Sequence, residues 1–162
     1  MSRLSKLILK MTEYEDGCVE RVNHFLKVYA FAKAIAEGEG IDDESQPILE
    51  AATIVHDIGI RVCFEKYGNC SGKLQEAEGP AMAMRMLPDC GYTPAQCDRI
   101  CWLIAHHHTY TDIQGMDYQI LVEADFLVNI FEGGMKKEAI EQVKENIFRT
   151  QTGTKLLCDL FL

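Results

Sequence analysis

The 162-residue sequence has no uninterrupted apolar run approaching the ~18 residues that a membrane span requires. Its early hydrophobic patch, Leu7-Ile8-Leu9, is also too short to be the core of a secretory signal. We therefore expect a protein that does not enter the membrane and that resides in the cytoplasm.

Positive charge is also scarce. The chain has 16 lysines and arginines against 25 aspartates and glutamates, a formal net charge of −9. Binding a nucleic-acid backbone needs clustered basic residues that displace counterions, so a nucleic-acid polymer is excluded as a partner. A small phosphorylated substrate remains compatible with this charge, because a bound metal ion locally reverses the sign of the field.

The Cys-x-x-Cys motif is absent, although the chain contains seven cysteines. An odd number without a secretory signal argues against a disulfide framework. Cys97 and Cys101 lie about one helical turn apart but lack the further ligands of a zinc site. The cysteines are expected to be free and to pack as small hydrophobic residues in a reducing cytosol.

Strand patterns, internal repeats, low-complexity tracts and linkers are missing as well. We predict a single all-α domain of about six to eight helices over residues 1–162. Its core is expected at 20–130, with C-terminal helices of 135–162 packing on that core.

Helices are expected over about 19–37, from Asp42 or Asp43 to His56, and over about 76–88, 94–108, 118–131 and 136–149, before an apolar tail from Thr152 to Leu162. Gly59 is placed to end the second helix, Pro80 to lie near the start of the third, and Thr93 to cap the fourth. The segments 60–75 and 109–116 are expected to be loops beside a functional site.

Three polar residues lie on the apolar stripes of their helices: His24, His56 and Asp125. His24 precedes Val28 by four residues, and His56 follows Ala52 by four. Residues at this spacing share one helix face, so the three side chains should point into the core. Any one of them alone is more often structural than functional, but their joint occurrence favours a common site.

Asp57 adds a second carboxylate beside His56. Ionised carboxylates on buried faces are costly unless they are paired or bound to metal. His24, His56, Asp57 and Asp125 are therefore predicted to meet at one divalent cation. A nitrogen and oxygen ligand set suits manganese, iron, cobalt, nickel or zinc better than calcium. Four protein ligands leave positions on a six-coordinate ion for water and substrate.

The order of these residues resembles the HD-domain superfamily of metal-dependent phosphohydrolases over about residues 20–130. His24-Phe-Leu-Lys-Val resembles the first histidine helix of that family, and Ala-Ala-Thr-Ile-Val-His56-Asp57-Ile-Gly resembles its signature. Glu-Ala-Asp125 resembles its closing Ala-Asp pair. The resemblance implies an all-α fold in which these four residues bind the first metal ion.

One departure from the family pattern concerns a second metal. Relatives with two metals often carry another histidine after the signature, but the matching segment here, Gln75–Gly79, has none. Glu76 or Glu78 is either a substitute oxygen ligand or an ordinary solvated acid.

The triple histidine that follows has members of two kinds. His107 and His108 lie on the inward face and are candidates for a second metal or for binding the substrate phosphate. His106 continues the opposite face and is expected to be exposed.

A second departure concerns the cation that contacts phosphate. Many relatives have a lysine directly after the signature, whereas this chain has Ile60 followed by Arg61. Arg61, Lys73 and Arg21 are therefore the candidates for phosphate binding.

The resemblance implies hydrolysis of a phosphate ester or anhydride in a small molecule, with a nucleotide as the leading substrate class. Asp57 would be both a metal ligand and the catalytic group that orients or deprotonates the attacking water. Two alternatives remain open: a di-iron oxygenase on the same scaffold, and a non-catalytic nucleotide-binding or signalling module. The apolar tail also leaves a homodimer open.

Overall fold

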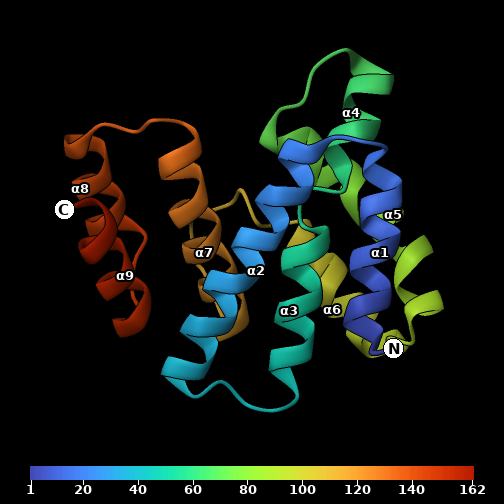
Figure 1. Cartoon of the computed structure of the whole chain (residues 1–162), viewed down its shortest axis with the longest axis horizontal. Coiled ribbons are helices and arrows are strands. Elements are labelled where there is room, and N and C mark those ends of the chain that lie inside the picture. The colour runs from blue at the N-terminus through green and yellow to red at the C-terminus, as the bar shows by residue number, and fades with distance from the viewer.

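The structure is a computed structural model that describes all 162 residues and contains only α-helices (Figure 1). The nine helices are α1 (Arg3–Glu15), α2 (Val19–Glu39), α3 (Ser45–Val55), α4 (Gly59–Tyr67), α5 (Gly72–Cys90), α6 (Pro94–Ile104), α7 (Met116–Glu132), α8 (Lys137–Asn146) and α9 (Gln151–Phe161). The expected all-α class is confirmed.

Helices α2, α3 and α7 lie side by side at the centre of the molecule (Figure 1). Helix α2 runs antiparallel to both α3 and α7, so that the first turns of α2, the end of α3 and the second half of α7 lie at one level. A cluster of 33 buried hydrophobic residues joins these helices to α1, α5 and α6. The core therefore surrounds the three helices that carry the predicted metal ligands.

Several predicted helix ends are confirmed. Thr93 caps α6, because its hydroxyl accepts from the backbone N–H of Gln96 while the Gln96 side chain accepts from the N–H of Thr93. This reciprocal capping box satisfies two backbone donors that a helix start otherwise leaves free. Helix α3 begins at Ser45, later than the predicted Asp42 or Asp43, although the Asp42 carboxylate accepts from the N–H of Ser45 at 2.8 Å. Gly133 ends α7.

The predicted loop over 60–75 is wrong, because it contains α4 and the start of α5. Gly59 opens α4 instead of ending α3, which stops at Val55. A Cβ at Gly59 would lie 2.9 Å from the backbone oxygen of Gln75, so this glycine lets α4 and α5 pack backbone to backbone. The close approach explains the residue better than helix termination does.

The predicted role of Pro80 is also wrong. Helix α5 begins at Gly72, where the Ser71 hydroxyl accepts from the N–H of Leu74, and it continues through Pro80. Packing of α5 against α4 and α6 stabilises the helix across the proline. Helix α1 was not expected either, and α6 ends at Ile104, before the triple histidine.

The C-terminal helices are attached through Glu123, which is fully buried in α7. Its carboxylate accepts from the backbone N–H groups of Arg149 and Thr150 and from the Thr150 hydroxyl, just before α9 begins. Helix α9 then packs on α2 and α7, with Leu157 fully buried.

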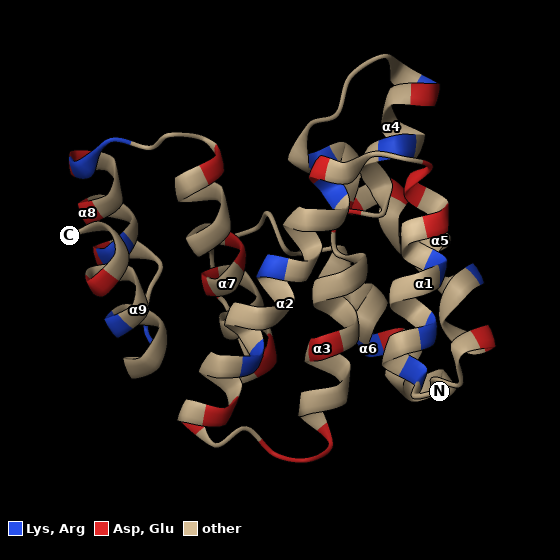
Figure 2. Ribbon diagram, viewed as in Figure 1, with Lys and Arg blue, Asp and Glu red and all other residues tan.

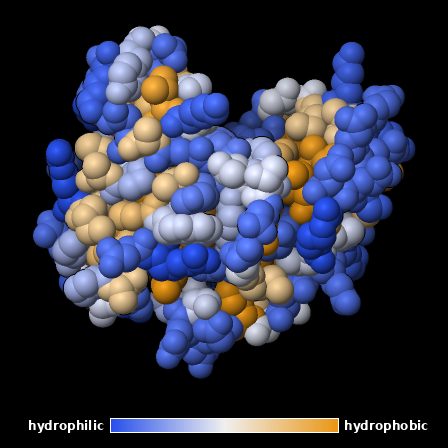
Figure 3. Space-filling view, turned by 180° about the vertical axis from the view of Figure 1, so that it is seen from behind, coloured by the Kyte–Doolittle hydropathy of each residue, from blue (hydrophilic) through white to orange (hydrophobic).

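The surface carries mixed charge. Both basic and acidic residues occur on most helices, whereas α3 and α7 carry acidic residues only (Figure 2). The rear face is largely hydrophilic, with apolar patches between the polar side chains (Figure 3). None of the helices has the length and apolar character needed to cross a membrane. All seven cysteines are free.

Candidate metal centre

The four predicted ligands meet where α2, α3 and α7 lie at one level. His24 comes from the second turn of α2, His56 and Asp57 directly follow α3, and Asp125 lies in the middle of α7. Nε2 of His24 is 3.3 Å from Nε2 of His56 and 3.1 Å from Oδ1 of Asp125. Oδ2 of Asp57 is 3.4 Å from Nε2 of both histidines. His24, His56 and Asp125 are buried.

Hydrogen bonds on the far side of each ring orient the two histidines. Nδ1 of His56 lies 2.8 Å from the backbone oxygen of Thr53, and Nδ1 of His24 lies 2.8 Å from Oε2 of Glu132. A carbonyl oxygen and a carboxylate can only accept, so Nδ1 is the donor in both rings. In the neutral state this leaves both Nε2 lone pairs directed at the space between the carboxylates, as metal coordination requires.

His107 brings a third imidazole to the same place. Its Nδ1 donates to the backbone oxygen of Ile104 at 2.7 Å. Its Nε2 is buried, has no hydrogen-bond partner and lies 3.4 Å from Oδ1 of Asp57. A buried polar atom without a partner is costly, so this nitrogen points to a ligand.

The close packing of these charges shifts their pKa values. Burial alone lowers the pKa of His56, but the charges of Asp57 and Asp125 outweigh it and raise the pKa to about 9. The pKa of His24 is also raised, because its hydrogen bond with Asp125 overcomes the effect of burial.

The two carboxylates shift in the opposite direction. Burial favours their neutral form, but His56 and His107 lower the pKa of Asp57 to about 2. The hydrogen bonds from His24 and His56 likewise hold the pKa of Asp125 far below its usual range despite burial. The metal-free centre therefore keeps two carboxylates ionised and balances them with protons on histidine.

These donors fit a divalent transition metal. Two groups of side chains could each hold a metal ion, because the possible ligand atoms within each group lie within 4.8 Å of one another. The first group is His24, His56 and Asp57, and the second is Asp57, His107 and His108. The donors are imidazole nitrogens and carboxylate oxygens, and the Nε2 atoms of all three buried rings face Asp57. The cluster can thus hold a metal ion.

Comparison with known proteins identifies the family. The model of the HD domain matches residues 21–146, a stretch that contains all four predicted ligands. The chain belongs to the HD-domain family. The HD fold also appears in the crystal structure of a predicted HD superfamily hydrolase from an uncultured Thermotogales bacterium. The two chains align with a TM-score of 0.70 and 23% identity, over 98% of this chain and 84% of the other. A search of curated proteins found no match.

In this HD domain, the segment Gln75–Gly79, which lacks the additional histidine, contacts His108. Gln75 is buried, and its Oε1 lies 3.1 Å from Nε2 of His108. Burial and the neighbouring His107 lower the pKa of His108 to about 4, so this ring is neutral near pH 7. Nε2 of His108 is therefore hydrogen-bonded to the side-chain amide of Gln75, whereas Nε2 of His107 makes no hydrogen bond.

Neither acidic candidate for the second metal joins the centre. Oε1 of Glu76 accepts from the backbone N–H of His108 at 3.0 Å and from the hydroxyl of Thr109 at 2.9 Å. Glu78 binds Lys66 and Tyr67, each at 2.6 Å, on the surface. The structure therefore assigns Glu76 to fixing the histidine turn and Glu78 to an ion pair.

The three candidate phosphate-binding cations are placed differently. Arg61 donates to the backbone oxygen of Tyr14 and pairs with Glu65 at 3.0 Å. Lys73 is exposed.

Arg21 is half-buried, pairs with the buried carboxylate of Glu15 and lies one turn before His24 on the same face of α2. Of the three candidates, Arg21 is the one that shares a helix with one of the four predicted ligands.

His106 lies on the Trp102 face, as predicted, but it is half-buried and not exposed. Its ring stacks on Trp102, with centroids 4.0 Å apart, and its Nδ1 donates to the Trp102 backbone oxygen at 2.7 Å.

Two polar neighbours of the ligands were not predicted from the sequence. Asn129 donates to Oδ1 of Asp125 at 2.9 Å, and Glu132 accepts from His24. Both share a face of α7 with Asp125, four and seven residues after it. This helical spacing was a signal that could have found them.

Proposed function

We propose that this HD domain is a metal-dependent phosphohydrolase that acts on a small phosphorylated molecule, with a nucleotide as the leading substrate class. One observation carries the proposal: the Nε2 atoms of His24 and His56 converge on the carboxylates of Asp57 and Asp125 at 3.1 to 3.4 Å. Membership of the HD-domain family adds support.

A divalent ion held by these four residues would polarise the phosphoryl group and make its bound water acidic enough to react near neutral pH. Asp57 presents its two oxygens in different directions, Oδ2 to His24 and His56 and Oδ1 to His107. Its lowered pKa keeps it ionised, so it can accept a hydrogen bond from water and orient it for attack.

Two further residues would act on the phosphate. His107 offers a buried nitrogen with no protein partner, positioned to bind a phosphoryl oxygen or to hold the proton of the leaving group. Arg21 would offset charge that develops on the transferred group. The scattered basic residues of Figure 2 agree with a small substrate better than with a polymer.

The test is phosphate release from a panel of nucleotides and sugar phosphates. The chain is stripped of metal and reloaded in turn with manganese, iron, cobalt, nickel and zinc. We expect metal-dependent release by the wild type, and a loss of at least about 100-fold in kcat for Asp57→Asn. Lys155→Met is the control, because Lys155 lies on α9, is 72% exposed and pairs with Asp159, so this change should leave kcat unchanged. Absence of turnover with every metal would overturn the proposal.

A di-iron oxygenase is the second candidate, favoured by one observation. Asp57 belongs to both possible ligand groups, as a carboxylate bridging two metals would. The hydrogen bond between His108 and Gln75 counts against a second metal, because it occupies Nε2 of His108, which that metal would need as a ligand. Two irons per chain with visible absorption that depends on oxygen would favour the oxygenase, and phosphate release with one metal would exclude it.

A further inference from the structure

Glu132 stands at the far side of His24 from the predicted metal. It is the last residue of α7, and its Oε2 lies 2.8 Å from Nδ1 of His24 on α2. Its other oxygen, Oε1, lies 2.6 Å from Nζ of Lys27, three residues after His24 on the same face of α2. One carboxylate thus bridges a lysine and the outer nitrogen of a predicted ligand.

The contact between Glu132 and His24 lies partly inside the protein. The Glu132 side chain is 33% exposed and that of His24 is 10% exposed, so the contact between them is shielded from solvent, whereas the lysine at its outer end reaches water. Both carboxylate oxygens of Glu132 therefore have a partner, Nδ1 of His24 for Oε2 and Nζ of Lys27 for Oε1.

A charged acceptor on Nδ1 has two consequences for a metal-binding imidazole. It fixes the tautomer in which Nδ1 carries the hydrogen, which leaves the Nε2 lone pair free for the metal. It also makes the ring a stronger electron donor, and a partner of this kind commonly changes metal affinity by about 10- to 100-fold.

The other two imidazoles are oriented differently. Nδ1 of His56 and Nδ1 of His107 donate to the backbone oxygens of Thr53 and Ile104, which cannot ionise. Among the three buried rings, those of His24, His56 and His107, only that of His24 has a carboxylate behind it. His24 is therefore the ligand whose donor strength a side-chain substitution can tune.

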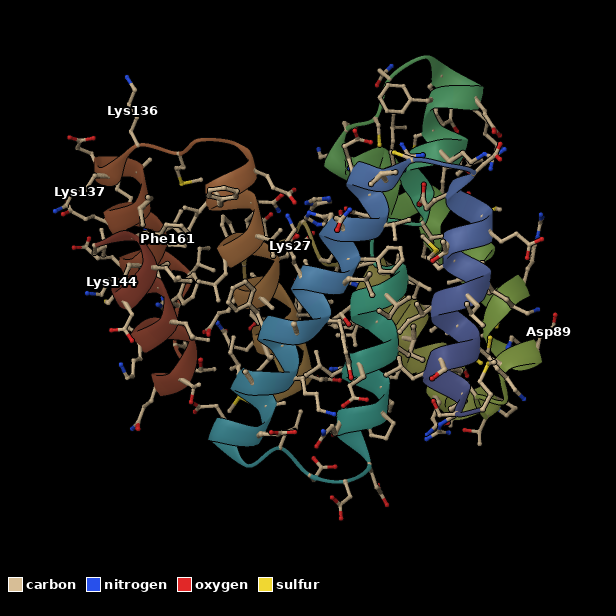
Figure 4. The ribbon with its side chains drawn as sticks, in the orientation of Figure 1. Lys27, Asp89, Lys136, Lys137, Lys144 and Phe161 are labelled. Carbon is tan, nitrogen blue, oxygen red and sulfur yellow. The ribbon has the colours of Figure 1, made fainter.

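We propose that Glu132 is a positioning residue that orients and strengthens His24 as a metal ligand, with Lys27 holding its carboxylate in place. This inference rests on the metal site of the proposed function but not on phosphate hydrolysis. It gives the end of α7 and Lys27 a role in supporting a metal ligand. Figure 4 shows Lys27 where α2 faces α7.

The experiment compares zinc affinity by calorimetry for wild type, Glu132→Ala and Glu132→Gln. The amide of glutamine can still accept from Nδ1 but carries no charge. We expect affinity to fall by about 10- to 100-fold in Glu132→Ala and by a smaller factor in Glu132→Gln. Glu37→Gln is the matched control, because Glu37 is on α2, 62% exposed and contacts Lys33 only at 4.0 Å.

Two further measurements distinguish the proposed role of Glu132 from a purely structural one. Denaturant unfolding of the metal-free variants measures any general loss of stability. Nitrogen-15 NMR of the histidine rings in the zinc-loaded protein reports the tautomer of His24. We expect Nδ1 of His24 to be protonated in the wild type and a less uniform tautomer in Glu132→Ala. If Glu132→Ala does not fold, the zinc affinities of Glu132→Gln and Glu37→Gln are compared instead, and equal affinities would overturn the role of Glu132.

The outcomes separate the two proposals. Zinc affinity of Glu132→Ala within twofold of wild type overturns the role of Glu132, even if the enzyme hydrolyses phosphate. Tight zinc binding that depends on Glu132, without hydrolysis of any substrate, overturns the proposed function alone. A wild-type chain that binds no zinc or other divalent metal overturns both.

Discussion

Metal binding should expel protons from the centre, because the metal-free histidines hold them tightly. The pKa of His56 rises from 6.5 to about 9, which corresponds to roughly 3 kcal/mol in favour of its protonated form. Nearly all metal-free molecules therefore carry a proton on His56 at pH 7, and the raised pKa of His24 also favours the protonated form of that ring. A metal ion needs the Nε2 lone pairs, so these protons must leave.

Affinity should consequently increase with pH. Between pH 6.5 and about 9 it should rise roughly tenfold per pH unit for each proton released. Calorimetry at pH 7 in buffers of different ionisation enthalpy counts the protons directly, and we expect between one and two per metal. A flat affinity from pH 6.5 to 8.5, with no protons released, would refute the charge arrangement described for the centre.

The same pKa values fix the pH dependence of metal-free stability. The contribution from the raised pKa of His56 is complete below pH 6.5 and is lost as pH rises through about 9. The contribution from the lowered pKa of Asp57 is complete above pH 3.8 and is lost as pH falls through about 2. The metal-free chain should therefore be most stable between about pH 4 and 6.5.

Three further predictions concern the scaffold, each checked by urea unfolding. Glu123→Ala should cost about 3 kcal/mol, because it leaves buried donors before α9 without an acceptor, and an unchanged midpoint would contradict that role. Gly59→Ala should cost about 1 to 3 kcal/mol, since its Cβ would meet the backbone of Gln75 at 2.9 Å, and full stability would show that α4 can shift. Thr93→Ala should cost about 1 kcal/mol through loss of the capping box, whereas Thr93→Asp should retain most of the stability.

The apolar stripes were enough to predict the inward positions of His24, His56 and Asp125. A four-residue spacing from apolar neighbours fixes the face of a helix, and that face is buried in this fold. Thr93 shows the same principle for a helix start, because its capping box depends only on residues three apart.

Other features depend on contacts between distant residues. Gly59 allows α4 to lie close to Gln75 of α5, and no local pattern around the glycine reveals this contact. Glu76 and Glu78 lie two residues apart, yet one fixes the histidine turn and the other pairs with Lys66. Their roles follow from how α5 packs against its neighbours, so the sequence left them open.

The central claim is that His24, His56, Asp57 and Asp125 bind one divalent metal ion. Its most direct test is elemental analysis after metal removal and equilibrium dialysis against zinc or manganese, for wild type and for His24→Ala and Asp125→Ala. We expect close to one ion per wild-type chain and almost none in either folded variant. Equal metal content in all three proteins would contradict the claim.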